Sequence, residues 1–297
     1  MSLDTVLMCQ PVRELIISLL DVKSLLRLRL CSPFLFDVVM KQRWNVNAHL
    51  RHFFYDPRRF RSMLGRCKAV LLGVNVLEFL TAERYERSDL TICFFDVAMV
   101  SEFSEYLICY EGCNVVDLEQ STGKTGSFQV LSTLSFHGAN HNLIRLVFSS
   151  NGVVDLVVKS GSTFDMNIMT WNEVISLFPY LSLVERKGLM TAVVGEKKLV
   201  RLARKEQWRR RGYGMLSCGM VSCPRCGASW SDVDELASFF CRISCERPWS
   251  MKLDVVGVAV PESLETMDLS IASKWKQAGF RACLSCCCVS QFFFMFE

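Results

Sequence analysis

Residues 68–117 read KAVLLGVNVLEFLTAERYERSDLTICFFDVAMVSEFSEYLICYEGCNVVD, and this stretch decides the fold. Short apolar runs alternate here with segments of helical period. The predicted elements, in chain order, are a strand at Ala69–Leu72, a helix at Val74–Ala82, a strand at Leu90–Phe95, a helix carrying Val100, Phe103, Tyr106 and Leu107, and a strand at Asn114–Leu118. This alternation predicts a sheet covered by helices.

A glycine precedes the first of these helices, and an aspartate opens the second strand. This order, with Gly73 and Asp89 in those places, resembles the core of the polymerase-beta-like nucleotidyltransferases. In that superfamily a Gly-Ser pair begins the helix, where backbone N–H groups face a triphosphate, and an Asp-x-Asp pair lies on the next strand. Because residues i and i+2 of a strand share one face, two such carboxylates can hold Mg²⁺.

The motif departs from the superfamily pattern at two positions. Val74 follows the glycine in place of a serine, and Thr91 stands where the second aspartate is expected. One carboxylate and one neutral hydroxyl make a poor cage for a divalent ion. Asp155, in the strand-like GVVDLVV, is a candidate third carboxylate on a neighbouring strand; the alternative is an aspartate at a strand end that faces solvent. The resemblance therefore argues for the fold more strongly than for the reaction.

Composition predicts a globular protein without a membrane span. The chain has 297 residues, of which 51% are hydrophobic and 22% charged, so it can hold two ordinary domains. The start lacks a basic region, its apolar run is interrupted by Arg13 and Glu14, and no stretch is long enough to cross a membrane. We therefore expect an intracellular protein of the cytoplasm or nucleus, with most of its 15 cysteines acting as small buried hydrophobes. The net charge of +4 is too small to indicate a class of binding partner.

Residues 11–44 predict two or three short helices. Pro11 precedes the first, Asp21 can cap the second, and Pro33 marks the third. The segment resembles an F-box, which opens with Pro-x-Glu-Leu and continues into a leucine-rich helix. The matching residues are Pro11, Glu14, Leu15, Leu25, Leu26, Leu28 and Leu30. The first helix is about one turn shorter than that of the family.

A helical unit of this size buries too little apolar surface alone, so its leucines must pack on another domain or on a partner. Under the resemblance, Leu15, Leu19, Leu25 and Leu26 would bind a ubiquitin-ligase adaptor, and the degenerate nucleotidyltransferase-like domain would bind a protein client. The alternative is that these helices pack on the chain's own downstream domain. The whole of residues 11–215 resembles uncharacterised fungal proteins that join an F-box-like segment to a degenerate nucleotidyltransferase-like domain.

Two basic segments leave nucleic acid open as a partner. The first is NVNAHLRHFFYDPRRFRSMLGRCKAV and the second is EKKLVRLARKEQWRRRGYG. We interpret the first as an amphipathic connector with solvated arginines. We interpret the second as a helix with one face packed on the sheet through Leu199, Leu202, Ala203 and Trp208 and the other face solvated. On this interpretation nucleic acid is not the expected partner.

Residues beyond 127 predict a wider sheet. FQVLSTLSF, NLIRLVFS and VVDLVV would form a meander of three strands, which makes the sheet mixed and the fold α+β. His137 and His141 flank its first turn, where a polar hairpin tip is preferred to a metal site. Residues 163–181 predict a strand, a turn and a helix capped by Asn172 that carries Val174, Ile175, Leu177 and Phe178.

The C-terminal quarter is rich in cysteine. Cys223, Cys226, Cys241 and Cys245 have the spacing of a structural zinc site, with Cys218 as a rival ligand and chance pairing as the alternative. The end, FRACLSCCCVSQFFFMFE, is compatible with a lipidated anchor, a buried final strand or a mistranslated gene end.

The predicted organisation is an F-box-like segment at 1–44, a nucleotidyltransferase-like α+β domain at 45–215, a zinc-knuckle segment at 216–260 and a tail at 261–297. The predicted function is that of a non-catalytic interaction protein, a substrate receptor with a pseudo-nucleotidyltransferase domain. The first alternative is a nucleotide-binding or nucleotidyl-transferring enzyme that uses Asp89 and Asp155 with Mg²⁺. The second is a basic RNA-associated module.

Overall fold

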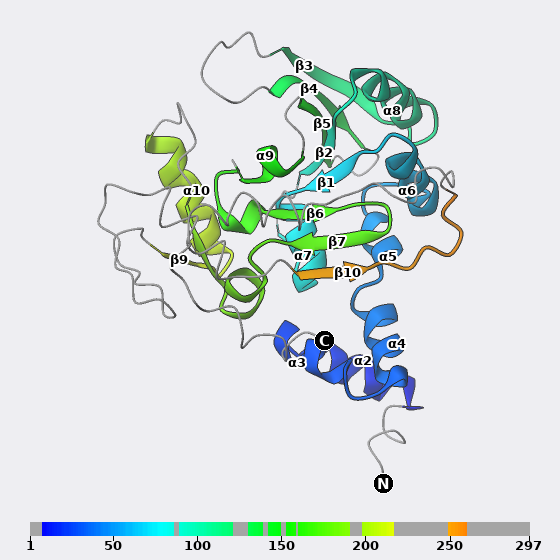
Figure 1. Ribbon diagram of the computed structural model, residues 1–297, viewed down its shortest axis with the longest axis vertical. Coiled ribbons are helices and arrows are strands. Elements are labelled where there is room, and N and C mark those ends of the chain that lie inside the picture. Colours follow the sequence, from blue (N-terminus) through cyan, green and yellow to red (C-terminus); the bar gives the residue numbers. More distant parts are fainter. Residues whose placement is uncertain are drawn as a thin grey trace, which may run out of the picture.

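A mixed sheet of eight strands runs through the computed structural model (Figure 1). The structure describes residues 8–85, 89–120, 130–138, 142–149, 153–158, 160–190, 198–216 and 249–259. Its strands, in spatial order, are β10 (Trp249–Lys252), β7 (Glu173–Ser176), β6 (Asn167–Met169), β1 (Val70–Leu72), β2 (Leu90–Phe94), β5 (Leu143–Ser149), β4 (Val130–His137) and β3 (Asn114–Gln120). Neighbouring strands are antiparallel, except that β2 and β5 are parallel. The α+β class and the mixed sheet are thus confirmed.

Several helices begin at a residue whose side chain caps the first turn. The helices are α2 (Gln10–Leu19), α3 (Val22–Leu28), α4 (Pro33–Gln42), α5 (Val46–Leu50), α6 (Pro57–Arg66), α7 (Val74–Thr81), α8 (Val97–Cys109), α9 (Val153–Val158) and α10 (Lys198–Arg210). Asp21 accepts the backbone N–H of Ser24, as predicted, and Asp96 accepts that of Ala98. A 3₁₀ turn, η1 (Thr163–Asp165), a π-helical turn, η2 (Tyr180–Val184), and a small parallel pair, β8 (Lys187–Leu189) and β9 (Gly214–Leu216), complete the described elements.

The sheet is covered on both faces. Successive strand residues point to opposite sides, so each strand contributes side chains to both cores. Leu71 belongs to the core on one side, where α6, α7 and α8 pack, whereas Val70 and Leu72 belong to the core on the other side. That second face is covered by α9 and η2, with α9 contributing Val153 and Val157. Within the first core, the rings of Phe54, in the loop before α6, and Phe60 stack at 3.7 Å between centroids.

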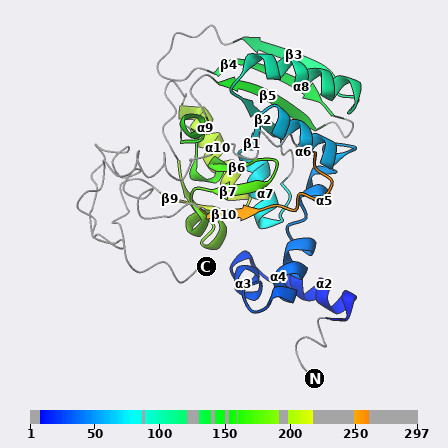
Figure 2. The same ribbon diagram turned by 45° about the vertical axis from the view of Figure 1, so that its right-hand side comes forward.

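The N-terminal helices α2, α3 and α4 lie at one end of the molecule, below the sheet (Figure 2). They are joined to it by a continuous core that includes Leu25 of α3. At the end of α4, Arg43 donates a hydrogen bond to the carbonyl oxygen of Thr81 at 2.8 Å, and the indole of Trp44 donates one to that of Leu80 at 3.0 Å. These bonds cap the carbonyl end of α7 and connect the helical segment to the sheet domain.

The predicted order of strands and helices from residue 69 to residue 118 is confirmed, whereas two later predictions are wrong. VVDLVV forms the helix α9 rather than a strand, because Val153 and Val157, one helical turn apart, both pack on the sheet. Residues 173–176 form strand β7 rather than a helix. Asn172 lies in the hairpin turn before β7, where the hydroxyl of Thr170 accepts the N–H groups of Asn172 and Glu173.

Strand β10 pairs with β7, so residues beyond 215 contribute to the same sheet. Within the part of the chain that the structure describes, no helix is both long and apolar enough to cross a membrane.

Candidate functional site

Gly73 connects strand β1 to helix α7 and has a φ of +83°, which residues with a side chain rarely adopt. Its N–H donates a hydrogen bond to the carbonyl oxygen of Asn167 on β6 at 3.1 Å. The glycine is therefore required by the turn itself. This position agrees with the expectation for Gly73 at the start of a helix, but the conformation alone accounts for it.

Asp89 precedes β2 and is paired with a cation from the neighbouring strand. The guanidinium of Arg145 donates a hydrogen bond to Oδ2 of Asp89 at 2.6 Å, and both side chains are partly exposed. In the parallel register of β2 and β5, Arg145 lies directly opposite Thr91. On the other side of β2, the partner of Thr91 is Leu72. Neither neighbouring strand thus places a carboxylate beside Thr91.

This arrangement disfavours a divalent cation beside Asp89. The single negative charge of Asp89 is already compensated by Arg145, and a metal ion there would be repelled by the guanidinium. Asp155, the predicted third carboxylate on a neighbouring strand, belongs instead to helix α9. Among the residues described, no group of three or more His, Cys, Asp or Glu side chains could hold a metal ion.

The predicted partner-binding leucines divide into two pairs. Leu25 and Leu26 of α3 are buried in the core. Leu15 and Leu19 of α2 are 60% and 76% exposed. Val12, at 38% exposure, continues the same face, because the spacing from residue 12 to 15 and 19 is that of a single helical face. Met8, which is 64% exposed, lies just before the helix. We call these four residues the α2 stripe.

Helix α10 packs on the protein through one large side chain. Trp208 is buried among Phe164, Tyr85 and Tyr213, so the predicted inward face is confirmed at that residue. Leu199 and Leu202 are 78% and 51% exposed, and the prediction that they pack on the sheet is wrong. Arg209 and Arg210 both pair with Glu206, which reduces the free positive charge of the helix.

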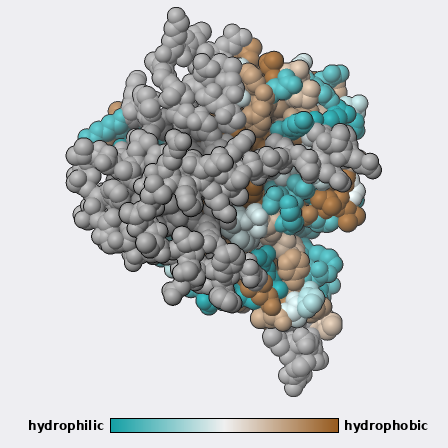
Figure 3. Space-filling model, in the orientation of Figure 1, coloured by the Kyte–Doolittle hydropathy of each residue, from teal (hydrophilic) through white to brown (hydrophobic). Residues whose placement is uncertain are grey.

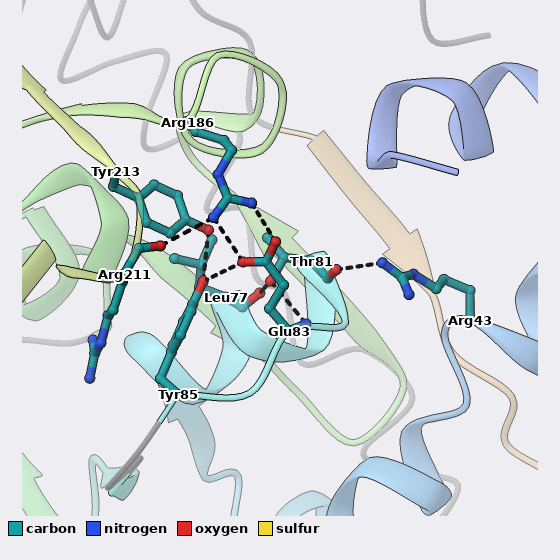
Figure 4. Close-up of polar contacts among 8 residues, drawn as sticks. All are labelled: Arg43, Leu77, Thr81, Glu83, Tyr85, Arg186, Arg211 and Tyr213. Atoms are coloured by element: carbon teal, nitrogen blue, oxygen red, sulfur yellow. Dashed lines mark hydrogen bonds and ion pairs between the residues drawn. The ribbon is translucent and has the colours of Figure 1, made fainter. Parts of the chain in front are cut away.

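A charged network at the end of α7 could not be predicted from the sequence (Figure 4). The carboxylate of Glu83 accepts hydrogen bonds from both terminal nitrogens of Arg186, and the hydroxyl of Tyr85 donates to it at 3.2 Å. The hydroxyls of Tyr85 and Tyr213 are 2.7 Å apart, and the guanidinium of Arg186 lies 4.5 Å from the ring centre of Tyr213. The bond to Glu83 raises the pKa of Arg186, while burial raises that of Tyr85.

A second polar group is buried within α7 itself. Asn75 and Glu78 are almost fully buried, and Nδ2 of Asn75 donates to Oε2 of Glu78 at 3.3 Å. Because Oδ1 of Asn75 is then an acceptor, Nε2 of His49 donates to it at 3.0 Å. Burial lowers the pKa of His49 to about 4, which keeps its ring neutral at physiological pH.

A pocket of about 180 Å³ opens beside this group, between the end of α4, helix α5 and the end of α7. Its lining includes Gln42, Arg43, Ala48, His52, Glu78 and Arg84.

Most of the remaining predicted site residues lie outside the part of the chain that the structure describes. Cys223, Cys226, Cys241 and Cys245, together with Cys218 and the cysteine-rich tail, lie outside the described residues. His141 also lies outside them, whereas His137 is exposed at the end of β4. The zinc site therefore stays a prediction.

Comparison with known proteins finds a distant structural likeness. No protein family matches the chain, and no curated protein matches its sequence. A solved structure of the Thermotoga maritima CCA-adding enzyme complexed with tRNA is similar over 86% of this chain, with 13% sequence identity and a TM-score of 0.39. The match covers 55% of that enzyme, so this chain spans about half of its length. A likeness at this score carries no argument about activity.

Proposed function

We propose that this chain is a non-catalytic interaction protein that presents the α2 stripe to the helices of a partner. The observation that carries the proposal is the exposure of Val12, Leu15 and Leu19 along one face of α2, together with that of Met8 just before the helix. Figure 3 shows hydrophobic surface interspersed with hydrophilic surface at the lower end of the molecule, where the N-terminal helices lie. Covering a large apolar side chain stabilises a complex by about 1.5–3 kcal/mol, which favours a partner with an apolar groove.

The pairing of Asp89 with Arg145 supports the non-catalytic part of the proposal. A nucleotidyl transfer assisted by two Mg²⁺ ions requires several carboxylates around one point. Asp89 is compensated by Arg145, and Thr91 offers only a hydroxyl. The sheet domain then acts as a scaffold, and its resemblance to a nucleotidyltransferase concerns shape rather than chemistry.

The partner class follows from the resemblance of residues 11–44 to an F-box. We propose a cullin-ligase adaptor as the partner of α2 and a protein client for the sheet domain, which makes the chain a substrate receptor. Leu25 and Leu26 face the chain's own core, so an adaptor would contact α2 rather than α3. This division explains how a first helix shorter than that of the family could still provide an interface.

The test uses the full chain and a purified cullin-ligase adaptor in a binding assay. Replacing Leu15 and Leu19 together by Glu should abolish binding, since each change places a charge in an apolar contact. Leu199→Glu is the matched control, because Leu199 is 78% exposed and Leu19 is 76% exposed, but Leu199 lies on α10. Binding by the double variant equal to that of the wild type, or no binding by the wild type, would contradict the proposal.

A further inference from the structure

The pocket between α4, α5 and α7 is lined by charged side chains of both signs. Its volume of about 180 Å³ is far above the roughly 10–15 Å³ that a single water molecule requires. Four charged side chains line it, namely Arg43, Arg84, Glu78 and Glu83. Whether the pocket attracts a ligand depends on which of these charges are already satisfied by the protein.

Both glutamates are engaged by groups outside the pocket. Glu83 is held by Arg186 and by the hydroxyl of Tyr85, and in Figure 4 its carboxylate points toward these two residues and away from Arg43. Glu78 accepts the backbone N–H of Tyr85 at 2.6 Å as well as the amide of Asn75. Both carboxylates are therefore hydrogen-bonded to donors other than the two arginines of the pocket.

Neither arginine forms an ion pair with any residue that the structure describes. Arg43 uses one terminal nitrogen to cap the carbonyl oxygen of Thr81, and its Nε is buried without a hydrogen-bond partner among those residues. Arg84 contacts Nε2 of His52, which is not an acid. An anion in the pocket would supply the opposite charge that both guanidinium groups lack.

We propose that this pocket binds a small oxyanion, a carboxylate or a phosphate, between Arg43 and Arg84. The planar guanidinium group suits both kinds of anion, because its N–H groups match the spacing of two oxygens. The pocket therefore fits a small carboxylate or a phosphate.

Such a ligand would join two parts of the fold. Gln42 and Arg43 belong to the end of α4, and Arg84 follows α7. An anion that contacts both ends would add a link between the N-terminal helices and the sheet domain, beside the two existing caps at Thr81 and Leu80. Ligand binding should therefore raise the melting temperature of the full chain.

The experiment is titration calorimetry of the full chain with inorganic phosphate and, separately, with succinate, at constant ionic strength. We expect saturable binding of one anion per chain, and the two titrations distinguish a phosphate site from a carboxylate site. Arg84→Ala should weaken binding about tenfold, because a charge-assisted contact is lost. Ala48→Phe should block the pocket without changing any charge, and both positions are exposed, so neither change disturbs the core.

Arg51→Ala is the matched control, because Arg51 is an exposed arginine beside α5 that does not line the pocket. It should bind the anion as the wild type does. The absence of saturable binding of either anion would overturn the proposal, as would unchanged binding by both Arg84→Ala and Ala48→Phe. A loss of binding in Arg51→Ala equal to that in Arg84→Ala would do the same, since it would show that only overall charge matters.

Discussion

The guanidinium of Arg61 donates two hydrogen bonds to the carbonyl oxygen of Trp171, at 2.9 and 2.7 Å. A third bond, at 3.1 Å, reaches Oδ1 of Asn47. Arg61 is fully buried in α6, and burial lowers its pKa to about 10, so it remains charged at neutral pH. This side chain therefore links the hairpin turn between β6 and β7 to helices α5 and α6 by hydrogen bonds.

Arg61→Met should lower the free energy of unfolding by about 3 kcal/mol. The methionine keeps an unbranched apolar stem but leaves the oxygens of Trp171 and Asn47 without a donor. Denaturation by urea measures the loss. Arg58→Met, on the exposed side of the same helix, should change stability by no more than about 0.5 kcal/mol. Equal stability of the two variants would show that the buried hydrogen bonds of Arg61 make no net contribution to the free energy of unfolding.

His49 should make the protein less stable in mild acid. Its folded pKa, about 4, lies below the ordinary value of 6.5, chiefly because of burial. The stabilising effect of the neutral ring is therefore complete above pH 6.5 and is lost as the pH falls toward 4, with a total of about 3 kcal/mol.

The control for this pH effect is His49→Gln, which has no titrating ring. Carboxylates also titrate in this range, so the quantity to measure is the difference in unfolding free energy between wild type and variant at each pH. That difference should shrink between pH 6.5 and pH 4. A constant difference would contradict the buried neutral histidine.

Leu25 and Leu15 should respond differently to truncation, because one is buried and the other exposed. Leu25→Ala should cost about 2–5 kcal/mol of stability, as is typical of a core leucine. Leu15→Ala should leave stability nearly unchanged. Thermal unfolding of both variants measures this contrast, and a large loss for Leu15→Ala would mean that the α2 stripe is covered within the protein.

The chain should not transfer nucleotides. Incubation with labelled nucleotides and Mg²⁺ should give no product, because Arg145 compensates Asp89 and Thr91 provides no second charge. A variant with both Thr91→Asp and Arg145→Ala should bind Mn²⁺ more tightly than the wild type, and Arg145→Ala alone should gain less. Transfer by the wild type that Asp89→Ala abolishes would overturn this prediction and favour the enzymatic alternative.

Purified protein should contain close to one zinc per chain if Cys223, Cys226, Cys241 and Cys245 form the predicted site. Cys223→Ser should lose the metal. Cys9→Ser is the control, because Cys9 is an exposed free cysteine in the N-terminal segment. Metal analysis that finds no zinc, or the same zinc content in both variants, would indicate that the cysteine spacing arose by chance.

Local sequence patterns predicted the elements between residues 69 and 118, because each has a clear period and a cap or glycine at its start. The pairing of Asp89 with Arg145 was not predictable, since the two lie 56 positions apart and meet only through the register of β2 and β5. The same holds for Glu83 and Arg186, which are 103 positions apart. Short apolar runs were misassigned because a buried helix and a buried strand of six residues show the same composition.

The pairing of β10 with β7 has a consequence for synthesis on the ribosome. Strand β7 ends at Ser176, whereas its outer partner begins at Trp249. At about 5–20 residues per second, the intervening chain takes roughly 4–15 s to emerge. During that interval the outer edge of β7 has unpaired backbone groups, which invite pairing with other chains. A nascent protein that is cut or stalled before residue 249 should therefore aggregate more readily than the finished one.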